Sequence, residues 1–167
     1  MTTSDETVVK PGWRFLFSNP AHLLAFGFGS GLARKAPGTF GTLVAFPIYW
    51  YIHPQLSDDQ FVLMLIFAFA IGVWVCGKTG RALGVADHGG IVWDEIVAFM
   101  LVLFFTPTGW YWSLLAFVSF RFFDIVKPPP IRYFDSNWHG GLGVMFDDLL
   151  AAGYALMCLA LVKSALI

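Results

Sequence analysis

Apolar runs with few or no charged residues alternate along this chain with short polar or glycine-rich segments. Five such runs occur, at residues 40–52, 61–76, 91–105, 110–126 and 149–161. A helix that spans a membrane needs about 20 apolar residues, with a range of about 17–25. Several of the runs are shorter, so we expect them to cross with the help of neighbouring helices or to be partly buried in protein. The pattern predicts an all-α fold, an integral membrane helical bundle of about five apolar helices.

The segment that precedes these runs, residues 11–28, mixes aromatic and aliphatic side chains with Arg14 and His22. It predicts an N-terminal interfacial amphipathic helix that is broken near Asn19-Pro20. The alternative is an ordinary core helix. Residues 1–10 are polar and are expected to form a flexible tail. Because no repeat, low-complexity tract or long linker divides the chain, we expect residues 1–167 to form a single membrane-embedded domain.

Composition supports a lipid environment. Hydrophobic residues make up 57% of the 167 residues and charged residues 13%, whereas soluble domains have about 45–50% and about 25%. A short chain cannot bury so much apolar surface within one small domain. The formal net charge of −1 provides no basic face, so no nucleic-acid partner is expected. Cys76 and Cys158 lie in apolar runs and are interpreted as buried hydrophobes, not as a disulfide or a metal pair.

The basic residues indicate an orientation in the membrane. If the N-terminus is cytoplasmic, nine of the ten Lys and Arg residues fall in cytoplasmic segments, and Lys163 is the exception. The positive-inside rule then favours five spans with the C-terminus outside. Most of the acidic residues at the ends of the apolar runs fall on the same cytoplasmic side.

Five carboxylates at these ends are the candidate metal ligands. They come from the start of the third run, the end of the fourth and the expected start of the fifth: Asp94, Glu95, Asp124, Asp147 and Asp148. Ionisable residues at membrane depth are costly and are functional candidates for that reason. Mg²⁺ takes oxygen ligands, often one or two carboxylates together with waters and substrate phosphate. The acids therefore predict a Mg²⁺ site that acts on a phosphate ester.

Each group of acids also has a structural interpretation. The acidic pair of the third run could form ion pairs with Lys78 or Arg81. Arg121 and Asp124 are three residues apart on one helix face and could satisfy each other. The helix dipole would stabilise one of the two aspartates if they opened the last helix.

Glycine turns and basic residues supply candidate phosphate contacts. Thr39 and Thr42 are expected to cap the helix that follows the glycine-rich segment, and a helix N-terminus with free N–H groups binds anions. The alternative is a re-entrant turn with a capped helix start and no ligand. Lys127 is held beside three prolines, which end the preceding helix. The candidate phosphate-binding residues are Ser30, Lys35, Thr39, Thr42, Arg121, Lys127, Arg132 and His139.

Four segments together carry a family resemblance. They are residues 29–32 with 36–39, residues 87–95 (DHGGIVWDE), residues 120–128 (FRFFDIVKP) with 130–132, and residues 139–148 (HGGLGVMFDD). In these segments, and over roughly residues 19–154, the chain resembles the phosphatidylglycerophosphatase A family, bacterial membrane phosphatases of phospholipid synthesis. Four motifs in the same order make the resemblance specific.

The resemblance implies Mg²⁺-dependent hydrolysis of phosphatidylglycerophosphate to phosphatidylglycerol and inorganic phosphate. The substrate would be a phospholipid of the cytoplasmic leaflet, and the protein a multi-pass protein of the bacterial inner membrane with its active site on the cytoplasmic face. In our interpretation Asp94, Asp147 and Asp148 hold the metal ion and Asp124 assists. Glu95, which also lies among the metal ligands, is the candidate general base, so the catalytic set is Glu95, Asp94 and Asp124.

The sequence leaves two alternative functions open. An ion or phosphate transporter could use the same carboxylates as an ion path, but its acids should be distributed through the membrane depth. A CDP-alcohol phosphotransferase would need spaced Asp-Gly and Asp-x-x-x-Asp motifs, which the sequence lacks. The sequence makes no prediction of an oligomeric state.

Overall fold

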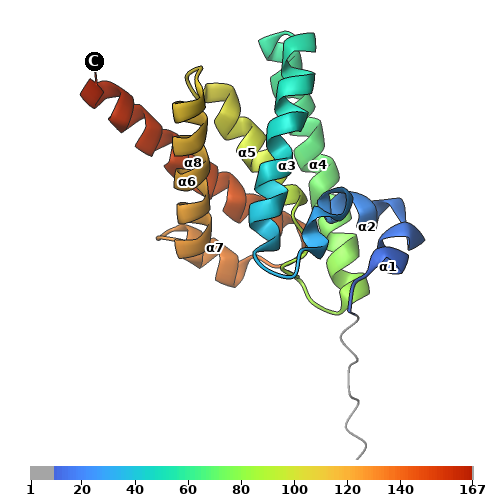
Figure 1. Ribbon diagram of the computed structural model, residues 1–167. Helices are drawn as coiled ribbons and strands as arrows, with labels where there is room; N and C mark the ends of the chain where they lie inside the picture. The colour runs from blue at the N-terminus through green and yellow to red at the C-terminus, as the bar shows by residue number, and fades with distance from the viewer. Residues whose placement is uncertain (1–9, 167) are drawn as a thin grey trace, which may run out of the picture.

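The computed structural model describes residues 10–166, and over these residues the chain is helical, without strands. The predicted tail, residues 1–10, lies outside the described residues except for Lys10. The elements are α1 (Trp13–Ser18), α2 (Pro20–Ala25), η1 (Gly27–Leu32), α3 (Pro37–Ile52), η2 (His53–Gln55), α4 (Asp58–Leu83), α5 (Trp93–Phe105), α6 (Trp110–Val126), α7 (Ile131–Asn137) and α8 (Gly141–Leu166) (Figure 1).

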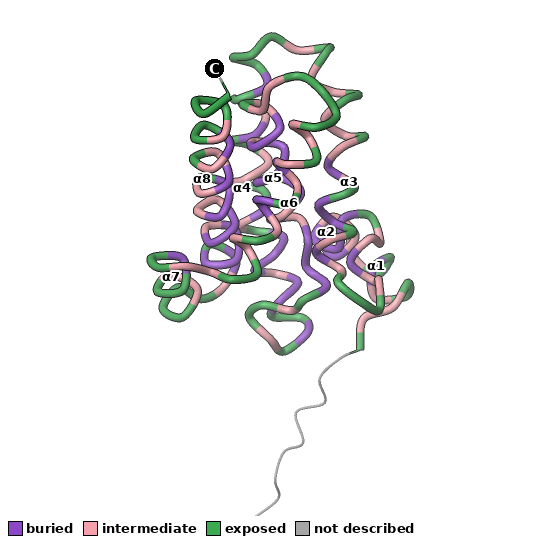
Figure 2. The backbone as a smooth tube through the Cα atoms, turned by 60° about the vertical axis from the view of Figure 1, so that its left-hand side comes forward, coloured by how far each residue is buried: buried purple, intermediate pink, exposed green. Residues whose placement is uncertain are grey.

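The longer helices form a bundle organised around α5 and α8. Helix α8 packs against α4, α5, α6 and α7, while α3 packs on α5 and α2 on α4. Figure 1 shows α3, α4 and α6 running along the bundle, and α5 and α8 inclined to them, with the C-terminal end of α8 projecting from the bundle. Helix α5 is the most enclosed of the long helices for its length: eight of its 13 residues are buried, Asp94 among them. The buried positions line the inner faces of the bundle in Figure 2, so an acid of α5 lies within the packed interior.

All five predicted apolar runs are helical, apart from Ile91 and Val92, which precede α5. The fourth run and α6 have identical bounds, 110–126. The last run was expected to begin its helix at Asp147-Asp148, and this is wrong, because α8 already begins at Gly141. The first two glycines of α8, Gly141 and Gly143, serve close packing. A Cβ on Gly141 would lie 1.8 Å from the carbonyl oxygen of Val73 on α4.

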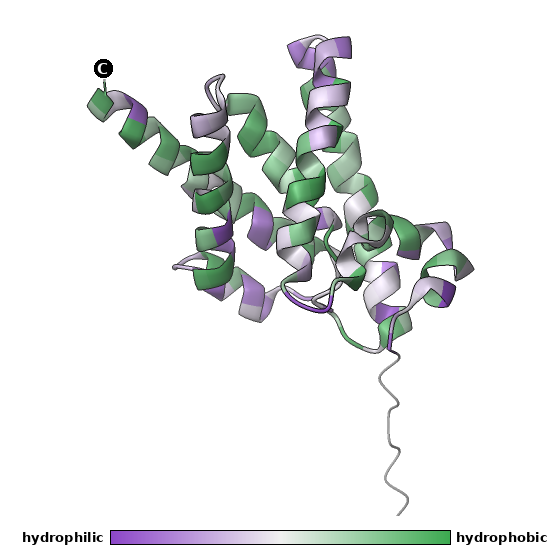
Figure 3. Ribbon diagram, viewed as in Figure 1, coloured by the Kyte–Doolittle hydropathy of each residue, from purple (hydrophilic) through white to green (hydrophobic). Residues whose placement is uncertain are grey.

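Two of the described helices, α4 and α8, are long and apolar enough to cross a membrane. Each has 26 residues, or about 39 Å at 1.5 Å per residue, against a hydrocarbon core of about 30 Å. Within the apolar 18-residue stretch of each helix, only 33% of α4 and 22% of α8 is buried, so most of this apolar surface faces outward. Figure 3 shows the apolar colouring over the middle of the bundle and polar residues at its ends. Helices α3, α5 and α6 have 16, 13 and 17 residues. Their lengths of about 20–26 Å are shorter than the hydrocarbon core of about 30 Å.

The N-terminal segment is broken at Asn19, as predicted. The Asn19 side chain accepts a hydrogen bond from the N–H of Ala21, and Pro20 takes the first position of α2. Around the break, Leu16 is fully buried whereas Phe17 is 70% exposed. The segment is therefore amphipathic, with one face packed on the bundle and an aromatic face left outside.

Candidate active site

The candidate acids lie where the start of α5, the end of α6 and the start of α8 meet, near the lower end of the bundle in Figure 1. Asp94, Asp147 and Asp148 are 7%, 5% and 3% exposed. The charges of Asp124, Asp94, Asp147 and Glu95 all act on Asp148. Three helices that are distant in sequence thus bring five carboxylates into one electrostatic cluster, which we call the acidic cluster.

The helix dipole does not account for the two aspartates of α8. They occupy the seventh and eighth positions of the helix, and no acidic residue lies in its first turn. Because the effect of the dipole falls off within the first turn, another interaction must compensate these two buried carboxylates.

Arg121 is the cation that pairs with the acids of α5 and α6. Its Nη1 atom donates to Oε1 of Glu95 at 3.1 Å and lies 2.5 Å from Oδ2 of Asp124. The Arg121–Asp124 pair is therefore confirmed, and it extends to Glu95. Lys78 instead lies over the ring of Trp74, 5.1 Å from its centre. The ion pair suggested by the sequence exists for Glu95, but Arg121 is its partner.

Lys127 is the second cation of the site. It ends α6 in the left-handed conformation, with φ of 46°, and its ammonium group donates to Oδ1 of Asp135 at 2.6 Å and to Oδ2 of Asp147. Burial lowers the pKa of Lys127, but its bonds to these two carboxylates outweigh burial and raise the pKa above its ordinary value. The sequence did not predict Asp135 as a partner of Lys127. The only sequence feature that could have indicated this contact is the triple proline, after which the chain turns back and places α7 near the end of α6.

The start of α3 approaches the acidic cluster through glycines. A Cβ on Gly38 would lie 1.9 Å from Oε1 of Glu95, and one on Gly41 would lie 3.2 Å from Oε2. The predicted threonine caps are wrong. The N-cap of α3 is Ala36, with φ of 47° and no capping side chain, and the Thr42 hydroxyl donates to the carbonyl of Gly38 at 2.8 Å. Pro37 occupies the first helical position, which leaves both threonines too far along the helix to cap it.

The other candidate phosphate residues divide into two groups. His139 lines a small cavity of about 40 Å³ together with Asp135 and Asp147, so it joins Lys127 at one edge of the cluster. Ser30 donates to the carbonyl of Gly27, and Lys35 and Arg132 are exposed. Over the described part of the chain, these last three and Thr39 have no hydrogen bond or ion pair with the cluster. His88 accepts at Nδ1 from the N–H of Gly90, and both cysteines are free.

The donor atoms of the cluster suit a hard cation. Four buried carboxylate oxygens have no hydrogen-bond partner: Oδ1 of Asp94, Oε2 of Glu95, Oδ1 of Asp147 and Oδ2 of Asp148. A buried polar atom without a partner costs about 1–3 kcal/mol, and more if it is charged. Carboxylate oxygens are the ligands that Mg²⁺ and Ca²⁺ take. Between residues 10 and 166, no three His, Cys, Asp or Glu side chains are arranged closely enough to enclose a metal ion, so side-chain rotation would be needed to complete a ligand shell.

Comparisons with known proteins give the family. A family model described as phosphatidylglycerophosphatase A matches residues 23–163. The phosphatidylglycerophosphatase A of Escherichia coli K12 is 48% identical over 83% of this chain and 80% of its own length. That of Haemophilus influenzae Rd is 49% identical over 83% and 86%. A Bacteroides thetaiotaomicron protein with the provisional name phosphatidylinositol-3-phosphatase is 38% identical over 84% and 92%. No solved structure matches the chain. This chain belongs to the phosphatidylglycerophosphatase A family.

Proposed function

We propose that this chain hydrolyses phosphatidylglycerophosphate to phosphatidylglycerol and inorganic phosphate, with a Mg²⁺ ion held by the acidic cluster. The family and the two relatives of nearly 50% identity support a phosphatase of phosphatidylglycerol synthesis. The observation that supports the metal is the set of four buried carboxylate oxygens without partners. Among residues 10–166, Arg121 and Lys127 are the two cations paired with these acids, so the cluster keeps an excess of negative charge that a divalent cation would compensate.

In the proposed mechanism each group has one task. Asp94, Asp147 and Asp148 would hold the metal ion with Asp124, and the ion would polarise the phosphoryl oxygens and lower the pKa of a bound water. Arg121 engages Oε1 of Glu95, which leaves Oε2 free to accept a proton from the attacking water.

Lys127 is the residue that we assign to the phosphate dianion. Its ammonium group lies between two carboxylates at the end of α6, and its raised pKa keeps it charged through the physiological range. A charged ammonium is a strong point donor to phosphate. Phosphate binding would replace one of its present carboxylate partners.

We further propose a multi-pass arrangement in the bacterial inner membrane, with α3, α4, α5, α6 and α8 embedded and the acidic cluster at the cytoplasmic face. Two observations support it. The site-forming ends of α5, α6 and α8 lie together at one end of the bundle, and nine of ten basic residues belong to that side by the positive-inside count. The short helices α3, α5 and α6 would be accommodated by local thinning of the bilayer.

The test is phosphate release by the full chain purified in detergent, with phosphatidylglycerophosphate as substrate. We expect release in Mg²⁺, loss of release in excess chelator, and recovery when Mg²⁺ is restored. Asp148→Asn should abolish release or raise the Mg²⁺ concentration for half-maximal rate at least tenfold. Asp59→Asn, which changes an exposed acid at the far end of α4, should behave as wild type. Full activity in chelator would refute the metal assignment, and faster hydrolysis of phosphatidylinositol 3-phosphate would refute the assigned headgroup.

A further inference from the structure

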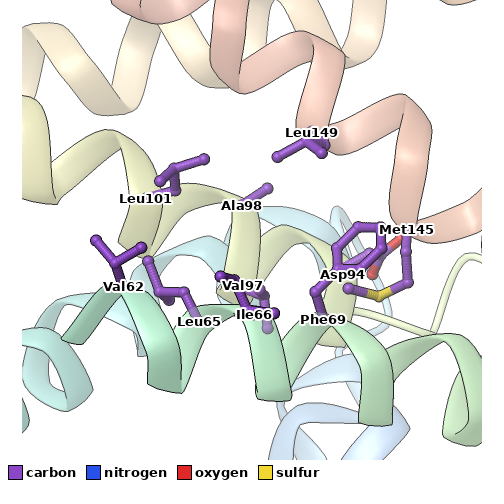
Figure 4. A pocket seen from close by; sticks show the side chains of 10 residues that line it. All are labelled: Val62, Leu65, Ile66, Phe69, Asp94, Val97, Ala98, Leu101, Met145 and Leu149. Carbon is purple, nitrogen blue, oxygen red and sulfur yellow. The ribbon is translucent and has the colours of Figure 1, made fainter. Parts of the chain in front are cut away.

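A cavity of about 240 Å³ opens between α4, α5 and α8, and the mechanism above does not use it. Nine of its ten lining residues are apolar, and the tenth is Asp94. In Figure 4, Asp94 and Met145 lie at one end of the cavity, and Val62 and Leu101 lie at the other. One end of an apolar cavity therefore coincides with an acid of the proposed metal site.

We propose that this cavity binds the first part of an acyl chain of the phospholipid substrate. The proposal rests on the proposed function and adds a subsite for the lipid tail, with the phosphate end at Asp94. A pocket for a whole small ligand usually measures about 300–1,000 Å³. A volume of about 240 Å³ therefore suits a segment of one hydrocarbon chain better than a headgroup.

The position of the cavity relative to the membrane supports a lipid as its occupant. It lies between α4 and α8, the two described helices that are able to cross a membrane. Its rim includes Ile66, which is 60% exposed, whereas Ala98 in its wall is 3% exposed. The cavity thus has an open side on the outward apolar surface of α4 and a closed wall formed by α5, so a chain can enter sideways from the bilayer.

The direction of the cavity matches that of a lipid molecule. Asp94 and Leu101 are seven residues apart on α5, which corresponds to about 10 Å along the helix axis. Asp94 lies in the first turn of α5, and Leu101 lies two turns further along this apolar helix, at the other end of the cavity (Figure 4). A phospholipid with its phosphate at the acidic cluster would therefore point its chains along the cavity, toward the bilayer interior.

The preference of the enzyme for substrates with long acyl chains tests whether this cavity binds an acyl chain. The full-length protein is assayed with phosphatidylglycerophosphate carrying two hexanoyl or two palmitoyl chains, and kcat/KM for the long-chain substrate is divided by that for the short-chain one. Ala98→Leu places a larger side chain in the cavity and should lower this ratio about tenfold, which equals about 1.4 kcal/mol. Expelling about two methylenes from an apolar site has an effect of this size. Ala70→Leu, at an exposed position of α4 outside the cavity, should keep the wild-type ratio.

A second pair of variants covers the case in which Ala98→Leu does not fold. Ile66→Trp closes the cavity from its exposed rim and should also lower the ratio, whereas Ile71→Trp, exposed on the same helix at 47%, should not. An unchanged ratio in both cavity variants would overturn the proposal, as would an equal loss on both substrates. A change of oligomeric mass without a change of ratio would assign this face to a second copy of the chain and would also overturn it. Failure of the wild-type protein to hydrolyse either substrate would refute the proposed function itself, which is a separate outcome.

Discussion

Replacing Gly141 with alanine is expected to force α4 and α8 apart at the start of α8. The added Cβ would lie 1.8 Å from the carbonyl oxygen of Val73 and 2.8 Å from the backbone nitrogen of Gly77. Both atoms belong to the backbone of α4, so no side chain can rotate away to relieve the contact. The two helices must separate, and the acids that follow in α8 must move with them.

The expected loss of stability follows from two opposing effects. Overpacking a well-packed interior costs typically about 1–3 kcal/mol, and a contact between two backbones belongs at the upper end of this range. Alanine gains up to about 1 kcal/mol over glycine in a helix interior, and this is an upper limit at Gly141, the first residue of α8. The net destabilisation is therefore about 2 kcal/mol, which for a chain of this size lowers Tm by about 4–8 °C.

Gly153→Ala is the matched control, because it makes the same change in the same helix. A Cβ at Gly153 meets no atom within 4 Å, so only the helix-propensity gain of up to about 1 kcal/mol remains. Thermal unfolding of both variants in one detergent, followed by circular dichroism, separates the effects. A Tm for Gly141→Ala equal to or above wild type would refute the close approach of α4 and α8.

Three further predictions concern the cluster. Gly38→Ala should leave Tm within a few degrees of wild type but lower phosphate release about 10²-fold, because the Cβ would displace the flexible end of Glu95 and small misplacements of a reacting group cost this much; normal release would contradict it. Arg121→Gln should destabilise the protein by about 3 kcal/mol, since it leaves two carboxylates without their shared cation, and an unchanged Tm would exclude this role. Asp135→Asn should cost at most about 1 kcal/mol, because the pair with Lys127 is partly exposed. The pKa of Lys127 is raised in the folded protein, so the stabilisation that its ion pairs provide is complete below the ordinary lysine pKa and is lost only above it. The difference in unfolding free energy between wild type and Asp135→Asn should therefore be constant from pH 6 to 9 in denaturant titrations.

The sequence predicted those features that depend on local pattern. The predominantly apolar runs became helices because lipid or a protein interior is the favourable environment for such surface, and α6 has the predicted bounds. The Arg121–Asp124 pair followed from the geometry of one helix face. The break at Asn19 followed from its proline and its capping side chain.

The features that depend on tertiary contacts were mispredicted or missed. Glycines near residue 140 signal either a turn or a close helix contact, and only the position of α4 decides in favour of the contact at Gly141. The pairing of Lys127 with Asp135 needs the chain reversal after α6. The contact between Gly38 and Glu95 likewise joins residues 57 positions apart in the chain, so no local pattern carries it.

Helix α8 is uninterrupted from Gly141 to Leu166, so it connects the acids near its start rigidly to its own C-terminal end. Asp147 and Lys163 are 16 residues apart, about 24 Å along this axis. If α8 crosses the bilayer as proposed, anchoring of Lys163 at the far interface would set the depth of the acids at the near one. Lipid thickness would then act as an adjustable variable of the reaction, because a thicker bilayer would draw the aspartates away from the headgroup layer in which the substrate phosphate resides.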